Sequence, residues 1–330
     1  MMDNLKRLLE QFGPSGNEEK IGDEIANQLK GYVDEIKKDR LGNVIAIKKG
    51  KGSGRMMLAA HMDQIGVMVT GIEKEGYLRF TQVGYVDPYT VLYHNVIFPD
   101  GTIGTIAREE KKSIKELKLS NLYIDIGAST KEDAALKVSI GDFGVFQTVP
   151  YQNGTRLSSG ALDNRISCYI LIEAAKRIKE SYMDLYFVFT VQEESYTSGA
   201  ATSAYAIEPD CAIVVDVTDT GDTPECQRMA VRLGKGPAIK VMDRGMICHP
   251  EMKRYLADKA AEHGIAYQYE VLEAGSTDGA EIHISRSGVP TGAVSIPARY
   301  IHTPQEMVDM EDVEKAIKLV VIASEEYKNN

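Results

Sequence analysis

The sequence predicts an α/β protein with a central mixed sheet, helices on both faces of that sheet, and a small inserted β-rich unit. Strand-length apolar runs alternate with amphipathic helices in residues 1–65 and 150–330, a pattern typical of a sheet covered on both sides. Between about residues 66 and 149, short β-rich runs are separated by turn signals instead. The length of 330 residues suits one large domain with an insert.

The first 65 residues predict two helices and a hairpin, followed by a buried strand. Apolar residues from Leu5 to Phe12 recur at helical spacing, and Pro14 ends that pattern. Asn17 is the predicted N-cap of the second helix. Leu41-Gly42-Asn43 predicts the hairpin turn, and the apolar strand Met56 to Ala60 follows it.

The insert contains predicted strands such as 66–70 and 77–83, with one short helix at 131–136. After residue 162 the alternation of helices and strands resumes. In chain order this region contains helix 164–179, strand 185–191, helix 199–206, strand 211–216, helix 250–263, strand 266–269, strand 291–296 and helix 312–327.

Composition and charge exclude several classes of function. The 38 Lys and Arg stand against 48 Asp and Glu, so the net charge is −10, and without a basic stripe a nucleic-acid partner is not expected. The longest apolar runs have strand length, which predicts no membrane span. The four cysteines show no C-x-x-C spacing and the first residues are charged, so we expect a reduced, cytoplasmic protein without a signal peptide.

Several catalytic signatures are absent from the sequence. It contains no G-x-S-x-G elbow, no H-E-x-x-H helix and no G-x-x-x-x-G-K-[ST] loop. The glycine-rich stretch 50–54 is a polar turn with no helix behind it. These absences weaken the serine hydrolase, zincin and nucleotide-binding hypotheses.

Side chains able to bind metal lie at the ends of several predicted strands, and the carboxyl ends of strands in an open α/β sheet border the binding crevice. An isolated His or Asp at such a place is more often a turn former, and paired glutamates are common on solvated helices. Here Glu193 and Glu194 instead follow the apolar run from Tyr186 to Val191, where a solvated face would be unusual. The candidate residues are His61, Asp63, Asp163, Glu193, Glu194, Asp216 and His302.

Five of these candidates suit a pair of divalent ions bound through mixed imidazole and carboxylate ligands, with one carboxylate bridging. Adjacent residues at a strand end point in different directions, so one of Glu193 and Glu194 can bind metal while the other faces a substrate. Asp63 lies on the same side of an extended chain as His61 and can accept the second N–H of its imidazole. The five are His61, Asp163, Glu194, Asp216 and His302.

These residues belong to five short motifs, which three further motifs accompany. The five are His61-Met62-Asp63-Gln64-Ile65-Gly66, Ala161-Leu162-Asp163-Asn164-Arg165, Val191-Gln192-Glu193-Glu194, Val215-Asp216-Val217-Thr218 and Arg299-Tyr300-Ile301-His302-Thr303-Pro304. The three are 123–128, 234–237 and 288–292. In this order and over nearly the whole chain, they resemble the motifs of the glutamyl, leucyl and deblocking aminopeptidase family, cocatalytic dinuclear metallopeptidases that form tetrahedral dodecamers.

The resemblance implies a role for each matching residue. Glu193 is the implied general base, and Asp63 is the implied partner of the metal-binding imidazole. A cis peptide between Asp163 and Asn164 is also implied, as is a PDZ-like dimerisation domain in residues 66–149. The two implied metal sites share Asp163 and consist of His61, Asp163 and Asp216 on one side, and Asp163, Glu194 and His302 on the other.

We therefore expect a metal-dependent aminopeptidase that removes N-terminal residues from peptides and assembles from dimers into a homo-dodecamer. Two divalent ions per subunit are expected, zinc first, with cobalt and manganese as alternatives. The alternatives are an endoglucanase-like glycoside hydrolase, which the absence of Trp disfavours, and a non-catalytic assembly protein. Gln64, the stretch 195–198 and Ser276 depart from the family pattern, so the preferred N-terminal residue stays open.

Overall fold

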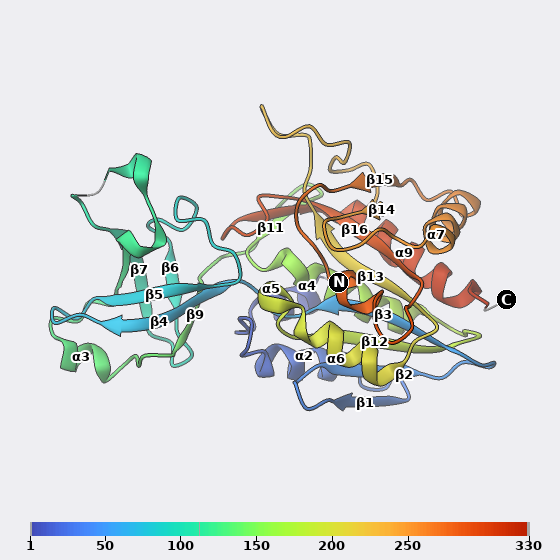
Figure 1. Ribbon diagram of the computed structural model, residues 1–330, viewed down its shortest axis with the longest axis horizontal. Coiled ribbons are helices and arrows are strands. Elements are labelled where there is room, and N and C mark those ends of the chain that lie inside the picture. Colours follow the sequence, from blue (N-terminus) through green and yellow to red (C-terminus); the bar gives the residue numbers. More distant parts are fainter. Residues whose placement is uncertain (1, 112, 329–330) are drawn as a thin grey trace.

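The computed structural model describes residues 2–111 and 113–328, which form a larger α/β unit and a smaller β unit beside it (Figure 1). The predicted mixed α/β architecture is confirmed. Within the described ranges, none of the helices combines the length and the hydropathy that a membrane span requires.

A mixed sheet forms the centre of the larger unit, and the described residues contribute eleven strands to it. Neighbouring strands β12, β3, β13 and β16 are parallel, and the other pairings along the main path are antiparallel. Across the sheet the strands are β1 (Glu35–Lys38), β2 (Val44–Lys48), β12 (Asp184–Thr190), β3 (Arg55–His61), β13 (Cys211–Thr218), β16 (Thr291–Arg299), β17 (Glu306–Asp309), β11 (Arg156–Ser159) and β10 (Tyr151–Asn153), with β14 (Ala238–Met242) and β15 (Gln268–Val271) branching from β16.

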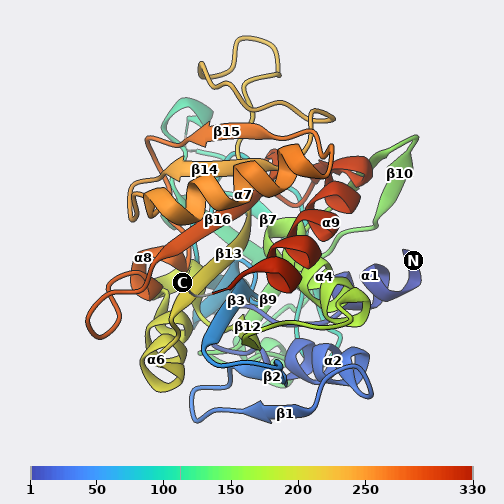
Figure 2. The same ribbon diagram turned by 90° about the vertical axis from the view of Figure 1, so that its right-hand side faces the viewer.

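Helices cover both faces of this sheet, as predicted. One face packs against α1 (Met2–Leu9), α2 (Glu19–Leu29), α4 (Leu162–Arg177), α7 (Pro250–Glu262) and α9 (Met310–Glu326). The other face packs against α6 (Ser198–Ile207) and α8 (Gly279–Ile282). Figure 2 shows α6 and α8 on one side of β13, β3 and β12, and α4, α2 and α9 on the other.

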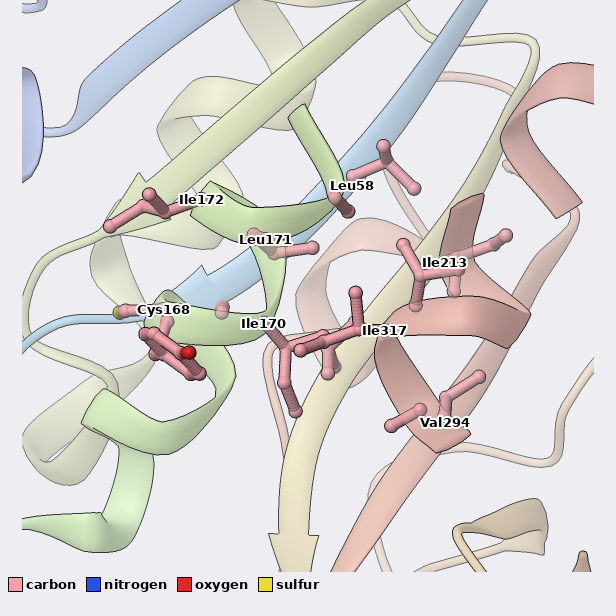
Figure 3. Packing of buried hydrophobic residues seen from close by; sticks show 14 of the residues in the cluster. Leu58, Cys168, Ile170, Leu171, Ile172, Ile213, Val294 and Ile317 are labelled. Atoms are coloured by element: carbon pink, nitrogen blue, oxygen red, sulfur yellow. The ribbon is translucent and has the colours of Figure 1, made fainter. Parts of the chain in front are cut away.

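The two faces explain why the central strands are apolar throughout. Leu58 of β3 belongs to the same buried cluster as Ile170, Ile213 and Ile317, and Figure 3 shows this cluster close to α4. Its neighbour Met57 belongs to the core on the opposite face. Each fully buried side chain of this kind contributes roughly 1.5–3 kcal/mol of burial free energy, so both layers of helices hold the strands in register.

The smaller unit is a closed barrel that has its own hydrophobic core. Its strand order is β4 (Gly66–Ile72), β5 (Leu78–Val83), β8 (Leu122–Asp125), β7 (Ile103–Arg108), β6 (Asn95–Ile97) and β9 (Phe143–Phe146). It also contains α3 (Lys131–Ala135) and the short 3₁₀ turns η1 (Ile114–Glu116) and η2 (Leu119–Asn121). The predicted β-rich character of this region is confirmed, whereas the PDZ-like topology and the dimerisation role stay predictions.

The predicted hairpin is confirmed, since β1 and β2 pair antiparallel.

The start of α2 differs from the sequence prediction. The predicted N-cap Asn17 is wrong, because α2 begins at Glu19 and Glu18 occupies the N-cap position without capping the helix through its side chain. Its carboxylate instead accepts hydrogen bonds from the backbone of Gly16 and Gln192.

Candidate metal centre and active site

The candidate residues meet at the carboxyl ends of the parallel strands. β3 ends at His61, and Thr190, its partner in the register, ends β12. Asp216 lies near the end of β13, and His302 lies in the loop after β16. Asp163 lies at the start of α4, directly after the barrel and the hairpin of β10 and β11. The order of the strands therefore brings together residues that are far apart in the sequence.

Two imidazoles contact opposite oxygens of one carboxylate. Nε2 of His61 lies 3.1 Å from Oδ1 of Asp163 and 3.7 Å from Oδ1 of Asp216. Nε2 of His302 lies 3.2 Å from Oδ2 of Asp163 and 3.0 Å from Oε2 of Glu194. Asp163 therefore lies between the two imidazoles, and its peptide bond to Asn164 is cis, as the resemblance implied.

The two neighbouring glutamates face different imidazoles. Oε2 of Glu193 lies 3.8 Å from Nε2 of His61, whereas Glu194 contacts His302. The expected cause was the alternation of side chains along an extended strand, and this is wrong. The chain leaves β12 at Thr190, adopts a left-handed conformation at Gln192 with φ of 56°, and enters the short helix α5 (Glu193–Tyr196).

Asp63 contacts the site in a way that only partly matches the prediction. Its Oδ1 lies 3.5 Å from Nδ1 of His61, which is long for a hydrogen bond, and its own carbonyl oxygen is nearer at 3.2 Å. The carboxylate instead accepts hydrogen bonds from the backbone N–H groups of Glu193 and Glu194, at 3.1 and 3.2 Å. An N–H on Nδ1 directed to that carbonyl leaves Nε2 free for a metal ion.

The electrostatics of the cluster favour cations. Burial raises the pKa of Glu193, Glu194 and Asp216. Burial would lower the pKa of His61 and His302, but the carboxylates around each imidazole outweigh it and hold both pKa values well above their usual range. Carboxylates outnumber imidazoles in this buried space, so additional positive charge would stabilise it.

The residues present fit a metal centre. The cluster contains two groups of three residues that share Asp163. Within each group, the ligand atoms all lie within 4.8 Å of one another. Oε1 of Glu194 is buried and has no hydrogen-bond partner, which leaves a lone-pair donor available to an ion. Mixed nitrogen and oxygen donors of this kind suit divalent transition metals. The groups are His61, Asp163 and Asp216, and Asp163, Glu194 and His302.

Two buried carboxylates that were not among the candidates from the sequence hold the backbone around the cluster. Glu306 accepts hydrogen bonds from the backbone N–H groups of Asp163, at 2.8 Å, and His302, at 3.1 Å. Glu18 accepts one from the backbone of Gln192 at 3.0 Å. For Glu306 the available signal was a Glu directly before the apolar pair Met307 and Val308, and for Glu18 it was a Glu directly after a Pro-Ser-Gly-Asn turn.

A cavity of about 920 Å³ opens over the cluster, and the residues of both candidate ligand groups line it. The barrel contributes Tyr85, whose ring centroid lies 6.1 Å from that of His302. Beyond the cluster the wall includes Arg244 and Glu281 together with small residues of the loop 274–277. The cavity is large enough for the terminal residues of a peptide.

The sequence matches the family model of the M42 glutamyl aminopeptidases over residues 42–319. The chain belongs to this family. M42 peptidases are metallopeptidases, and every candidate residue from His61 to His302 lies inside the matched range.

Similar proteins agree with the family assignment. A putative aminopeptidase from Acetivibrio thermocellus is 50% identical over 324 residues, and the match covers 98% of each chain. Aminopeptidase APDkam598 from the archaeon Desulfurococcus kamchatkensis has a TM-score of 0.95 and 38% identity, covering 98% of this chain and 94% of that one. PhTET1-12s, a dodecamer in its asymmetric unit, has a TM-score of 0.90 and 34% identity over 99% of each chain. This M42 chain is therefore an aminopeptidase, a hydrolase that acts on peptide bonds, and the alternatives of a glycoside hydrolase and a non-catalytic protein are set aside.

Proposed function

We propose that this aminopeptidase uses two divalent metal ions that share Asp163. His61 and Asp216 complete one set of ligands, and Glu194 and His302 complete the other. The observation that carries the proposal is the contact of the two imidazoles with opposite oxygens of Asp163. Zinc suits these donors best, and cobalt and manganese are alternatives. When bound, the ions supply Lewis acidity to the scissile carbonyl and lower the pKa of a water molecule.

Glu193 is the proposed general base. Its carboxylate lies 3.8 Å from Nε2 of His61 but belongs to neither group of proposed ligands. Burial raises the pKa of Glu193, which suits a group that takes a proton from water and returns it to the leaving amine. Asp63 supports it by accepting the N–H groups of Glu193 and Glu194, and by its carbonyl contact with His61.

The proposed substrates are peptides with a free N-terminus. Carboxylates line the cavity over the site, among them Asp219, and a carboxylate there could accept a protonated α-amino group. A terminal residue bound in this way would place the first peptide bond over the proposed metal ligands. Removal of one residue at a time would follow from that placement.

We predict that metal removal abolishes hydrolysis and that metal addition restores it. The chelator-treated protein should not cleave any aminoacyl-anilide, because Glu193 alone cannot polarise the scissile carbonyl. Adding zinc, cobalt or manganese separately should restore cleavage, and elemental analysis of the active form should give two ions per chain. Full activity of the stripped protein would contradict the proposal, and activity with a single ion per chain would reduce it to a mononuclear site.

We also propose that the barrel, residues 66–149, is a PDZ-like dimerisation domain from which a dodecamer is built in the cytoplasm. The dodecamer of PhTET1-12s supports this, as do the large apolar side chains that the barrel exposes, among them Leu136, 86% exposed, and Ile140, 66% exposed. The four free cysteines are consistent with the reducing cytoplasm.

Light scattering should give a particle about twelve times the 36.4 kDa chain mass. Leu136→Glu combined with Ile140→Glu should give smaller particles with the metal content retained, since both residues lie on the barrel. The matched control Lys137→Glu changes charge at a neighbouring exposed position without removing an apolar contact. A full-length protein that is monomeric at working concentration would overturn the assembly proposal and leave the chemistry standing.

A further inference from the structure

The segment 13–18 connects the ends of two strands that carry the site. After β3, the N–H of Gln64 donates to the carbonyl of Gly13 at 3.1 Å, and the N–H of Ser15 donates to the carbonyl of Gln64 at 3.2 Å. After β12, the hydroxyl of Ser15 lies 2.8 Å from the hydroxyl of Ser195 in α5. The segment thus contacts the backbone beyond His61 and the helix that begins with Glu193.

Glu18 makes the contact nearest to the glutamates. Its side chain is buried, at 7% exposure, and one oxygen, Oε1, accepts from the N–H of Gly16 at 2.6 Å and from the N–H of Gln192 at 3.0 Å. Together with Asp63, it accepts three consecutive backbone N–H groups, those of residues 192, 193 and 194. Two buried carboxylates therefore hold the turn from which both glutamates project.

This turn needs such support because of its backbone conformation. Gln192 has φ of 56°, a left-handed conformation that is unfavourable for a residue with a side chain unless its surroundings hold it. A rotation at Gln192 would move Glu193, the next residue, away from His61. The hydrogen bond from Gln192 to Glu18 opposes that rotation, and it comes from a segment that contains no metal-type ligand.

We propose that Glu18 is a positioning residue that keeps the general base Glu193 aligned with the reaction centre. The inference rests on the proposed function, in which Glu193 takes a proton from water. Glu18 acts only through the backbone of Gln192 and touches neither substrate nor ligand. When Glu18 is lost, Asp63 still holds the N–H groups of Glu193 and Glu194. Glu193 directly follows the released Gln192, whereas Glu194 lies one residue further on, so alignment of the base depends on Glu18 more than metal binding does.

The test compares four variants of the full-length, metal-loaded protein on one aminoacyl-anilide that the wild type cleaves. Glu18→Ala removes the hydrogen-bond acceptor of the N–H of Gln192. Glu18→Asp keeps the charge, but its shorter side chain moves the carboxylate away from that N–H. Glu18→Gln keeps an acceptor oxygen at the same position. Glu19→Ala is the matched control, because Glu19 is the exposed neighbour at the start of α2. The measurements are kcat and KM, metal content by elemental analysis, and hydrogen exchange of the peptide that spans residues 190–197.

Glu18→Ala and Glu18→Asp should lower kcat by about 10- to 100-fold, the scale of loss for a misplaced catalytic group, with KM and metal content close to wild type. Both should also speed hydrogen exchange in residues 190–197. Glu18→Gln should recover kcat and protection, and Glu19→Ala should match wild type in every measurement. A role in overall stability alone would lower the melting temperature without lowering kcat of the folded protein.

Two results would overturn the inference: wild-type kcat in Glu18→Ala, or a loss in Glu18→Gln as large as that in Glu18→Ala. If Glu18→Ala does not fold, Glu18→Asp decides in the same way. A wild-type protein that cleaves no aminoacyl-anilide with any metal would defeat the proposed function instead. Hydrogen exchange would then still decide whether Glu18 holds the turn, because unchanged exchange in Glu18→Ala would contradict that contact.

Discussion

Replacing Glu193 by Gln should remove most of the turnover and leave the metal content unchanged. The amide cannot take a proton from water, and the residue belongs to neither group of ligands. A positioned general base contributes about 10²- to 10⁴-fold to the rate, so kcat should fall by that factor. Kinetics and elemental analysis on the same preparation measure both quantities.

Glu194→Gln is the matched variant, because the two residues are adjacent and the substitution is identical. Oε2 of Glu194 lies 3.0 Å from His302, within one ligand group, so this variant should lose or loosen one metal ion. Excess metal should restore part of its activity and none of that of Glu193→Gln. If Glu193→Gln loses metal and Glu194→Gln keeps it, the two roles are exchanged. If both stay fully active, the reaction takes place elsewhere.

The central sheet could be predicted because burial on both faces leaves a strong local signal. The run Met56 to Ala60 predicts a strand, and β3 spans Arg55–His61. The side chains from Met56 to Ala60 enter two different cores alternately, so each of these positions is apolar and no helical period competes with the prediction. The hairpin before it could be predicted because Gly42 adopts positive φ in the turn.

The ends of elements were harder to predict, because backbone contacts from distant segments decide them. Asn17 has the side chain of a typical N-cap, yet the helix begins two residues later, at Glu19. The carboxylate of Glu18 is directed to Gln192, 174 positions away in the sequence. The turn at Gln192 likewise has no local signal, since glutamine rarely adopts the left-handed conformation.

The ligand-type residues of the site could be predicted, whereas two of the residues that hold them, Glu306 and Glu18, could not. His61 ends an apolar strand and Asp216 lies near the end of another, and parallel strands bring their carboxyl ends to one edge of a sheet. Glu306 and Glu18 instead accept backbone N–H groups, which every residue except proline has. The partner of such a carboxylate can be almost any type of residue. The sequence therefore contains no pattern that would identify the contact.

Replacing Lys240 by Met should destabilise the fold more than any surface change. Nζ of Lys240 contacts Glu270 and lies 3.2 Å from Oδ2 of Asp243, and all three side chains are fully buried. The substitution keeps the length of the side chain and leaves two acidic groups without their cation. Breaking a buried pair in this way costs about 3–5 kcal/mol of unfolding free energy. Urea denaturation of the metal-loaded protein measures the loss.

Removing the partner as well should recover much of that loss. Burial raises the pKa of Glu270 even with the opposing effect of Lys240, so the ammonium group does not fully offset the cost of desolvating this carboxylate. Lys240→Met combined with Glu270→Gln should therefore be more stable than Lys240→Met alone. Lys51→Met is the control, because its ion pair with Glu180 is exposed on both sides and such pairs contribute about 0–1 kcal/mol. A Lys240→Met protein as stable as this control, or a double variant less stable than the single one, would show that the buried ion pair does not govern stability here.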